Sequence, residues 1–211
     1  MKNTLETFLK EYKSTLYRRK ERIILPGENT NYVFYLAQGF VTQSILSPNG
    51  NQFTPYIFAP QTFFPLIWPP DEEIDNYEYE SLTPVEVSKI PKEELSEYLK
   101  INPQAAGIFN RQLTNYSLEL LKKLETRVFS DAFHLVVLTL LDLIKLFGKY
   151  EDRTILIEYW FTHHDIANIS GLSREVVTKQ MTKLAEKKLI SYKSHFIVID
   201  DFKALKTELE I

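Results

Sequence analysis

The sequence predicts an α+β fold in which a β-rich first half is followed by a long helix and a compact C-terminal helical segment. Short strand-like runs alternate with turn residues from Glu21 to Ile90, a pattern typical of a β-sandwich or barrel. Pro103 begins a helical stretch that continues to about Val128. Between Thr162 and Ile190, two amphipathic helices meet across a tight turn.

Bulk composition fits an ordinary globular protein. The 211 residues carry a net charge of −3, with 44% hydrophobic and 25% charged residues, which suits one large or two small domains. Cysteine is absent, and this excludes disulfides, thiolate metal sites and cysteine-ligated iron–sulfur clusters. The longest apolar run, Leu135 to Leu141, is far shorter than the roughly 20 residues of a membrane span, and no signal peptide is evident. We therefore expect a cytoplasmic protein without membrane contact.

The first half is expected to begin with a helix and continue as short strands. Apolar residues on one face predict a helix from Met1 to about Tyr17: Leu5, Phe8, Leu9, Tyr12 and Leu16. The predicted strands are Arg22–Leu25, Tyr32–Leu36, Phe40–Leu46, Gln52–Phe58 and Val85–Ile90. Asn49-Gly50 is a strong hairpin signal, and a short helix is expected after Pro91.

The long helix from Pro103 carries a near-heptad apolar stripe at Ile108, Leu113, Tyr116, Leu120 and Leu124. Over about three heptads, such a stripe suits either a core helix within the chain or a seam against a second copy. A hinge to the last domain is expected at Phe129-Ser130-Asp131, because Ser130 or Asp131 can cap the next helix.

The segment from Thr162 to Ile190 has the layout of a helix-turn-helix. Thr162 is expected to cap the first helix, and Asp165 stands where it can complete a capping box. Gly171 permits the positive φ that the turn requires. Ser173 is expected to cap the second helix, whose buried stripe would comprise Leu172, Val176 or Val177, Met181 and Leu184.

The start of the second helix carries side chains suited to DNA. Arg174 can donate to guanine O6 and N7, and Glu175 can accept from cytosine N4. Lysines further along the helix can bind phosphates. The candidate DNA-binding residues are Thr162, His164, Ser173, Arg174, Glu175, Thr178, Lys179 and Lys183. We favour DNA recognition over a two-helix corner with a solvated charged face, because caps, turn, core and polar positions all agree.

The adjacent His163 and His164 do not indicate a metal site, because neighbouring side chains on a helix point about 100° apart. Their place at a helix start favours contact with the DNA backbone, His164 above all. No nucleophile–base pair, Gly-rich phosphate loop or metal-ligand spacing stands out elsewhere. We therefore predict neither an enzyme nor a metal or other cofactor.

These helices, together with Asp131–Leu143 and Lys193–Leu205, resemble the CRP/FNR family of bacterial transcription regulators, and Glu21–Phe53 resembles the sensor domain of that family. The resemblance implies three parts. Residues 1–102 would form a β jelly-roll sensor (a cupin-like double-stranded β-helix) with an N-terminal helix. Residues 103–130 would form a dimerisation helix and hinge. Residues 131–211 would form a winged helix-turn-helix DNA-binding domain.

The resemblance also implies the partners. It implies a homodimer that reads a palindromic operator in double-stranded DNA, with RNA polymerase as a further partner if the protein is an activator. Lys179 stands where many members have Arg, and Gln180 where they have an apolar residue. Since Lys cannot reproduce the bidentate contact of Arg with guanine, an alternative is a CRP-like protein-interaction or small-molecule-binding module with weakened DNA recognition.

The sensor lacks the residues with which nucleotide-binding members of that family hold cyclic AMP. Those members carry a Gly-Glu pair and a later Arg-Ser pair. The matching positions here are Pro65-Leu66 and about Asp75-Asn76, in a segment made acidic by Asp71, Glu72 and Glu73. Because such a segment repels phosphate, we expect no control by cyclic AMP.

The remaining possibilities for the signal are a small organic effector or no effector at all. Haem sensing would need an axial ligand in the sensor, whereas all four histidines lie at or beyond His134. The candidate residues for an aromatic effector pocket are Phe63, Phe64, Trp68, Tyr77 and Tyr116. The alternative is that these rings belong to the barrel core, as aromatic residues in strands usually do.

Overall fold

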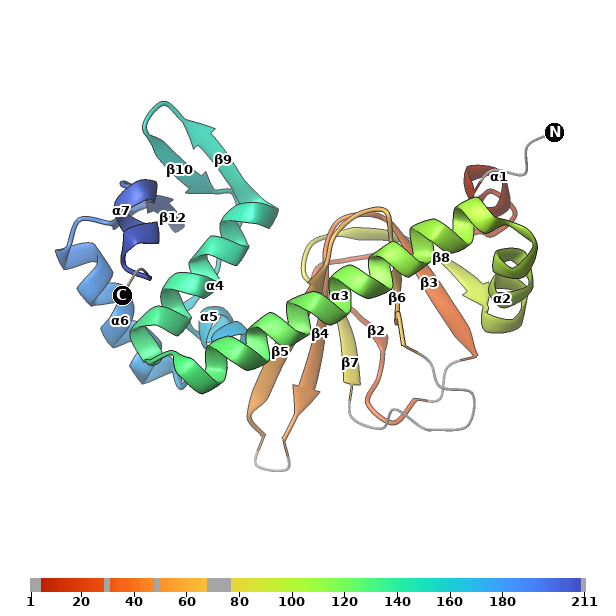
Figure 1. Ribbon diagram of the computed structural model, residues 1–211, viewed down its shortest axis with the longest axis horizontal. Coiled ribbons are helices and arrows are strands. Elements are labelled where there is room, and N and C mark those ends of the chain that lie inside the picture. Colours follow the sequence, from red (N-terminus) through yellow and green to blue (C-terminus); the bar gives the residue numbers. More distant parts are fainter. Residues whose placement is uncertain (1–4, 29–30, 48–49, 68–76, 210–211) are drawn as a thin grey trace. The chain divides into compact units, whose positions relative to one another are not determined.

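The computed structural model describes residues 5–28, 31–47, 50–67 and 77–209 (Figure 1). The chain divides into two compact units, Met1–Lys122 and Lys123–Ile211. Antiparallel sheets in the first unit and helix-turn-helix elements in the second confirm the predicted α+β class. No helix of the described part is long and apolar enough to cross a membrane.

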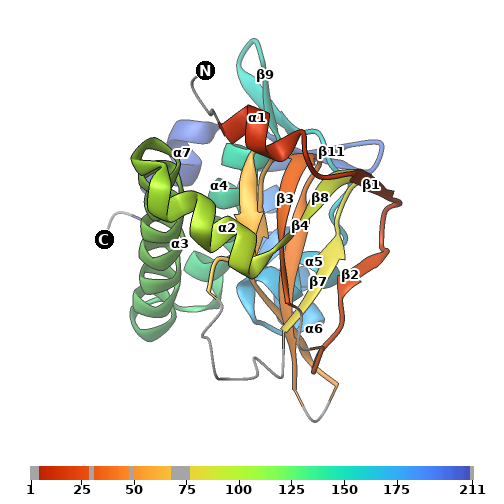
Figure 2. The same ribbon diagram turned by 90° about the vertical axis from the view of Figure 1, so that its right-hand side faces the viewer.

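The first unit is built on two four-stranded antiparallel sheets (Figure 2). One sheet has the order β1 (Ser14–Tyr17), β8 (Val85–Pro91), β3 (Tyr32–Gln38) and β6 (Thr62–Phe64). The other has the order β2 (Arg22–Ile24), β7 (Tyr77–Ser81), β4 (Val41–Leu46) and β5 (Gln52–Phe58). Apart from the β4–β5 hairpin, consecutive strands alternate between the sheets, and this order defines a jelly roll, as the resemblance implied.

The predicted hairpin is present between β4 and β5, where Leu46 pairs with Gln52. Gly50 has a φ of 79°, as its hairpin role requires, while Asn49 lies outside the described residues. Strands β6 and β7 had not been predicted. Each is short, and each gains its backbone partners from strands distant in sequence: β6 from β3, and β7 from β2 and β4.

The predicted N-terminal helix is wrong in its second half. Helix α1 spans only Leu5–Leu9, and Ser14–Tyr17 forms β1, which pairs with the edge of β8. Phe8 stacks on Tyr98 with ring centroids 3.9 Å apart, whereas Leu16 is 77% exposed. The backbone ladder with β8 therefore outweighed the helical spacing of apolar residues.

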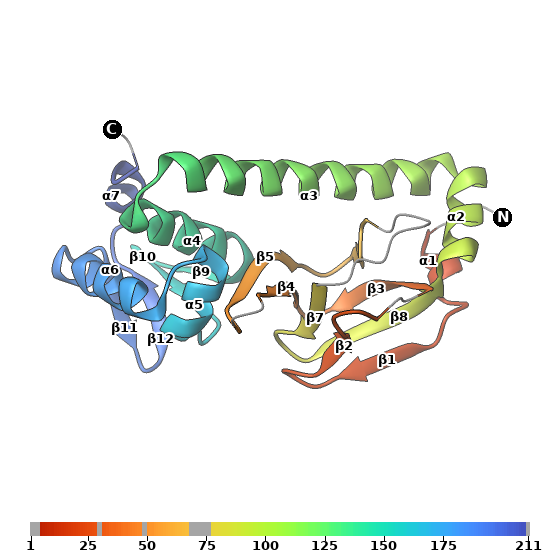
Figure 3. The same ribbon diagram turned by 90° about the horizontal axis from the view of Figure 1, so that it is seen from below.

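Helices α2 (Lys92–Ile101) and α3 (Pro103–Phe129) follow the jelly roll, and α3 is one continuous helix (Figure 3). The predicted stripe on α3 mixes two faces. Tyr116 is buried, and Leu113 and Leu120 pack against the jelly-roll core. Ile108 and Leu124 are exposed. A near-heptad series drifts around a straight helix of 3.6 residues per turn, so it could not specify one face.

Tyr116 joins α3 to the aromatic core of the jelly roll. Its hydroxyl donates to Oε1 of the buried Gln43 at 2.9 Å, and its ring meets that of Tyr56 edge-on at 4.8 Å. Phe58 stacks on Tyr116 as well, with centroids 6.1 Å apart. Burial raises the pKa of the Tyr116 phenol, which therefore keeps the proton that it donates.

The effector-pocket candidates are distributed through this core. Phe63, Phe64 and Tyr116 are buried, Tyr77 is partly buried, and Trp68 lies outside the described residues. A separate cavity of about 600 Å³ lies near Tyr35, Gln61 and Tyr98, and none of the four candidates that the structure describes lines it. Effector binding by these residues stays a prediction.

The second unit is a winged helix-turn-helix, as the resemblance implied. Asp131 caps α4 (Ala132–Phe147) by accepting from the His134 amide at 2.9 Å. A four-stranded sheet has the order β11 (Ile190–Lys193), β12 (Phe196–Ile199), β10 (Thr154–Ile157) and β9 (Gly148–Glu151). The helices of the motif are α5 (His163–Ser170) and α6 (Arg174–Glu186), and α7 (Phe202–Thr207) comes last. The β11–β12 hairpin is the wing of this domain.

Replacing Tyr116 by Phe tests the junction between α3 and the jelly roll. The substitution leaves the buried Gln43 oxygen without its hydroxyl donor, so we expect a loss of about 1–3 kcal/mol in the free energy of unfolding. Urea denaturation followed by circular dichroism measures it. In the Gln43→Leu/Tyr116→Phe double variant, the loss should be smaller than the sum of the two single losses. Additive losses would show that the hydrogen bond contributes nothing.

Candidate nucleic-acid interface

The start of α5 is fixed by a reciprocal cap. The Thr162 hydroxyl accepts from the Asp165 amide at 3.2 Å and donates to the Asp165 carboxylate at 2.7 Å. The carboxylate also accepts from the Thr162 amide at 2.8 Å. This confirms the predicted capping box. Thr162 is exposed, but its hydroxyl proton is already donated within the cap.

The turn between α5 and α6 depends on Gly171 and on a close neighbour, Arg127. Gly171 adopts a φ of 66°, in the left-handed region that the sequence predicted. A side chain built on Gly171 would collide with the Arg127 guanidinium, which donates from Nη2 to the Ser170 carbonyl at 3.2 Å. This cation lies at the C-terminal end of α5, where the helix dipole favours positive charge. Gly171 is thus favoured by its backbone conformation, and a larger residue there would also displace the Arg127 side chain.

Helix α6 begins with exposed polar residues. The Ser173 hydroxyl accepts from the Val176 amide at 3.3 Å, as expected of the cap. Arg174 and Glu175 are exposed in the first turn. The pKa of Glu175 lies below its ordinary value because the carboxylate accepts from its own backbone amide and from the Ser173 hydroxyl. Glu175 is therefore ionised and able to accept a further hydrogen bond.

The buried face of α6 is made by Val177, Met181 and Leu184. Val176, Leu172 and Gln180 are partly buried. Of the two valines left open by the sequence, Val177 is therefore the core residue. The candidates Thr178, Lys179 and Lys183 are all exposed.

The polar residues along α6 differ in how they are engaged. The Thr178 hydroxyl donates to the Arg174 carbonyl at 2.9 Å. The Lys183 ammonium lies 4.2 Å from the centroid of the Phe133 ring, a cation–π contact. His164 is exposed, and its Nδ1 lies 3.3 Å from the Asn168 amide nitrogen. The structure thus places all eight candidates at the starts of α5 and α6 or along α6.

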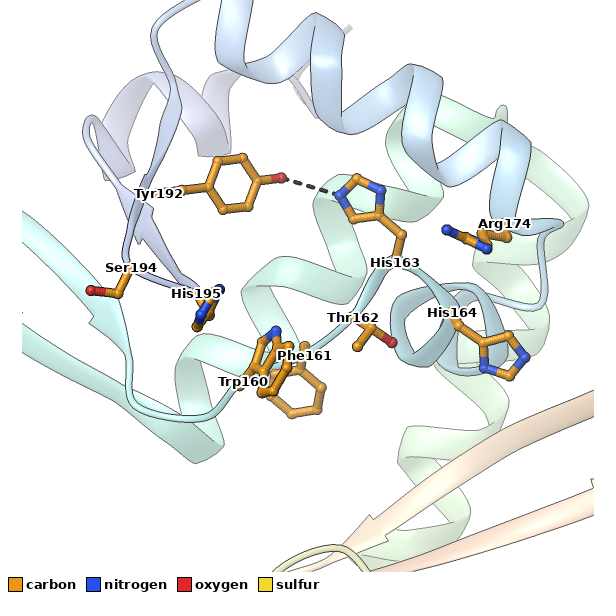
Figure 4. Close-up of a pocket in the computed structure, with 9 residues that line it drawn as sticks. All are labelled: Trp160, Phe161, Thr162, His163, His164, Arg174, Tyr192, Ser194 and His195. Atoms are coloured by element: carbon orange, nitrogen blue, oxygen red, sulfur yellow. Dashed lines mark hydrogen bonds between the residues drawn. The ribbon is translucent and has the colours of Figure 1, made fainter.

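A concave surface of about 500 Å³ lies beside these residues (Figure 4). Among the residues that the structure describes, its lining contains a guanidinium, three imidazoles and three hydroxyls, but no carboxylate: Trp160, Phe161, Thr162, His163, His164, Arg174, Tyr192, Ser194 and His195. The rings of Trp160 and His195 stack, with centroids 4.9 Å apart and planes at 28°. Groups that donate hydrogen bonds or carry positive charge suit a polyanion such as DNA.

Sequence reasoning missed the contributions of Trp160, Tyr192 and His195 to this surface. Tyr192 and His195 reach it because the wing closes with a tight turn, in which Lys193 pairs with Phe196 and Ser194 has a φ of 60°. The hydroxyl of Tyr192 lies 3.3 Å from Nε2 of His163. These contacts join residues far apart in the chain, so no local pattern could have indicated them.

Comparison with known proteins also identifies a helix-turn-helix domain in this part of the chain. Residues 136–208 match the family model described as the Crp-like helix-turn-helix domain. The chain is 28% identical over 177 residues to the global nitrogen regulator of a Nostoc species, a match that covers 83% of this chain and 79% of that protein. It is 23% identical over 197 residues to the cAMP-activated global transcriptional regulator CRP of Pasteurella multocida, covering 93% and 94%.

Solved structures share the fold over nearly the whole chain. FixK2 from Bradyrhizobium japonicum has a TM-score of 0.78 at 18% identity, covering 93% of this chain and 96% of FixK2. A transcriptional regulator of the CRP/FNR family from Thermus thermophilus has a TM-score of 0.77 at 21% identity, covering 94% and 99%. The Pasteurella and Thermus proteins are both described as transcriptional regulators.

Proposed function

We propose that this chain, a transcription regulator of the CRP/FNR family and not an enzyme, binds a palindromic DNA operator as a homodimer. The observation that carries the proposal is the start of α6. There a capped helix end holds Arg174 and Glu175 exposed, beside a concave surface with no carboxylate in its described lining. In helix-turn-helix proteins the first turns of the second helix enter the major groove.

Each candidate residue has a role in this proposal. Arg174 and Glu175 read base edges, with Lys179 beside them, while Thr162, His164, Ser173 and Lys183 contact the sugar–phosphate backbone. Thr178 is exposed on the same helix, and its hydroxyl donates a hydrogen bond to the Arg174 carbonyl. Because Lys179 offers a single ammonium where many members of the family have Arg, the operator is expected to differ from their usual half-site.

Replacing Arg174 by Ala tests base recognition. We expect a loss of about 1–3 kcal/mol in binding to the operator and a relaxed preference at one base pair of each half-site. Fluorescence anisotropy with the operator and with a scrambled duplex measures both quantities. The matched comparison is Lys183→Ala, which should weaken binding to all sequences alike and flatten the salt dependence. Unchanged sequence preference in the Arg174 variant would contradict the assignment of α6.

A face of α3 supports the homodimer. Leu118, Leu121, Leu124 and Val128 recur at spacings of three and four residues, and they are 50%, 61%, 62% and 66% exposed, respectively. This spacing places them on one stripe of the helix, away from the buried Tyr116. Exposed stripes of large apolar residues are typical of interaction surfaces. We infer that α3 pairs with α3 of a second copy, which would place two α6 helices on a symmetric operator.

A charge in this stripe should separate the two copies. We expect Leu121→Glu to shift the protein from dimer to monomer in sedimentation velocity at micromolar concentration, because it places two like charges in an apolar seam. The matched control is Leu16→Glu, which puts the same charge on an exposed leucine of β1. A Leu121→Glu variant as dimeric as wild type would contradict pairing through α3.

The signal is proposed to be something other than cyclic AMP. The positions that would hold the nucleotide are Pro65-Leu66 and about Asp75-Asn76, with no Arg between Arg22 and Arg111. The packed rings around Tyr116 support the same view. Titration calorimetry with cyclic AMP should give no heat of binding, and micromolar affinity would overturn this part of the proposal. RNA polymerase as a further partner, if the protein is an activator, and a cytoplasmic location complete the proposal.

A further inference from the structure

His163 occupies the centre of the concave surface, where three elements meet. It is the first residue of α5, yet its ring nitrogens contact Thr178 of α6 and Tyr192 of the wing. The contact with Tyr192 is marked in Figure 4. Nδ1 lies 2.9 Å from the Thr178 hydroxyl, and Nε2 lies 3.3 Å from the Tyr192 hydroxyl. One imidazole therefore connects α5, α6 and the wing.

The hydrogen bonds favour one neutral form of this ring. A hydroxyl has a single proton, and that of Thr178 is donated to the Arg174 carbonyl at 2.9 Å. With that bond in place, the Thr178 hydroxyl is an acceptor towards His163, and Nδ1–H is the donor. A neutral imidazole carries one N–H, so Nε2 is an acceptor and the Tyr192 hydroxyl donates to it.

The electrostatics agree with this assignment. Burial, followed by the positive charge of Arg174, holds the pKa of His163 below its usual value, which favours the neutral ring. Burial raises the pKa of the Tyr192 phenol, which therefore keeps the proton it donates. The contact with Thr178 is the shorter of the two, so it is expected to be the stronger.

We propose that His163 is a positioning residue for DNA recognition, which holds α6 and the wing against the start of α5 through its Nδ1–H tautomer. The inference rests on the proposed DNA-binding function. Through Thr178, the ring acts on the Arg174 carbonyl at the first turn of α6, and through Tyr192 it acts on the wing. Loss of the ring would loosen the orientation of Arg174 towards the bases without removing a charge from the interface.

The tautomer can be measured without DNA. In the full-length protein labelled with ¹⁵N-histidine, long-range ¹H–¹⁵N NMR spectra should show Nδ1 of His163 protonated and Nε2 bare. A protonated Nε2 with a bare Nδ1 would overturn the assignment. Because this measurement needs no operator, it tests the tautomer assignment independently of the proposed function.

The positioning role is tested by the ratio of affinities for the operator and a scrambled duplex. We expect His163→Leu to lower this ratio about five- to tenfold, the equivalent of one lost hydrogen bond, with an unchanged salt slope because no phosphate contact is lost. His163→Asn can still donate towards Thr178 and should retain most of the ratio. The comparison variant His164→Leu should weaken binding to both duplexes by the same factor.

A second variant keeps the test valid if His163→Leu folds poorly. Tyr192→Phe removes only the longer hydrogen bond, so its effect on the ratio should be smaller than that of His163→Leu. Combined with His163→Leu, it should add nothing further. Additive effects, a ratio equal to wild type in His163→Leu, or equal weakening on both duplexes would each overturn the inference. A wild-type protein with no sequence preference would contradict the proposed function instead.

Discussion

The left-handed turn at Gly171 is the constraint on which the DNA-binding surface depends. It sets the direction in which α6 leaves α5, and its φ of 66° is one that a residue with a side chain rarely adopts. The Arg127 guanidinium fills the space beside it and bonds the last carbonyl of α5. The caps at Thr162 and Ser173 then fix where each helix begins, so that Arg174 is presented at a defined helix end.

The jelly-roll unit is organised by a different interaction, the packing of Tyr116 against the strands. Its hydroxyl reaches the buried Gln43, and its ring lies among the aromatic rings of the core. One face of α3 is occupied by this packing, while another face leaves Leu121 and Val128 exposed. The same helix can thus pack against the jelly roll of its own chain and offer a second surface to another copy.

Much of this structure could be predicted where the determining forces are local. Capping at Thr162 and Ser173 and the positive φ of Gly171 follow from short-range hydrogen bonding and local backbone preference. The bounds of β5 follow from the turn residues on either side of it, among them Gly50 and Pro60. The predictions failed where distant partners decide the outcome. Ser14–Tyr17 is a strand because β8 offers it a ladder, and the α3 stripe is divided because the jelly roll covers only one face.

In the candidate DNA interface, too, the local features could be predicted from the sequence, and the contacts between distant residues could not. The residues of α5 and α6 could be identified from their order along the motif, because an α-helix fixes which neighbours share a face. The contributions of Trp160, Tyr192 and His195 depend on how the wing folds back beside α5, which the fold alone determines. For His163 the sequence favours contact with the DNA backbone over a metal site, but its contacts with Thr178 and Tyr192 are tertiary, so the sequence does not reveal them.

On the proposed function, α6 of each protomer reads one half of a twofold-symmetric operator. The most direct measurement is selection of binding sites from a pool of random duplexes, followed by sequencing. We expect an enriched palindrome whose half-site centres lie about one helical turn, ~10 base pairs, apart. Failure to enrich any sequence, or enrichment of a single half-site without its symmetric partner, would contradict the account.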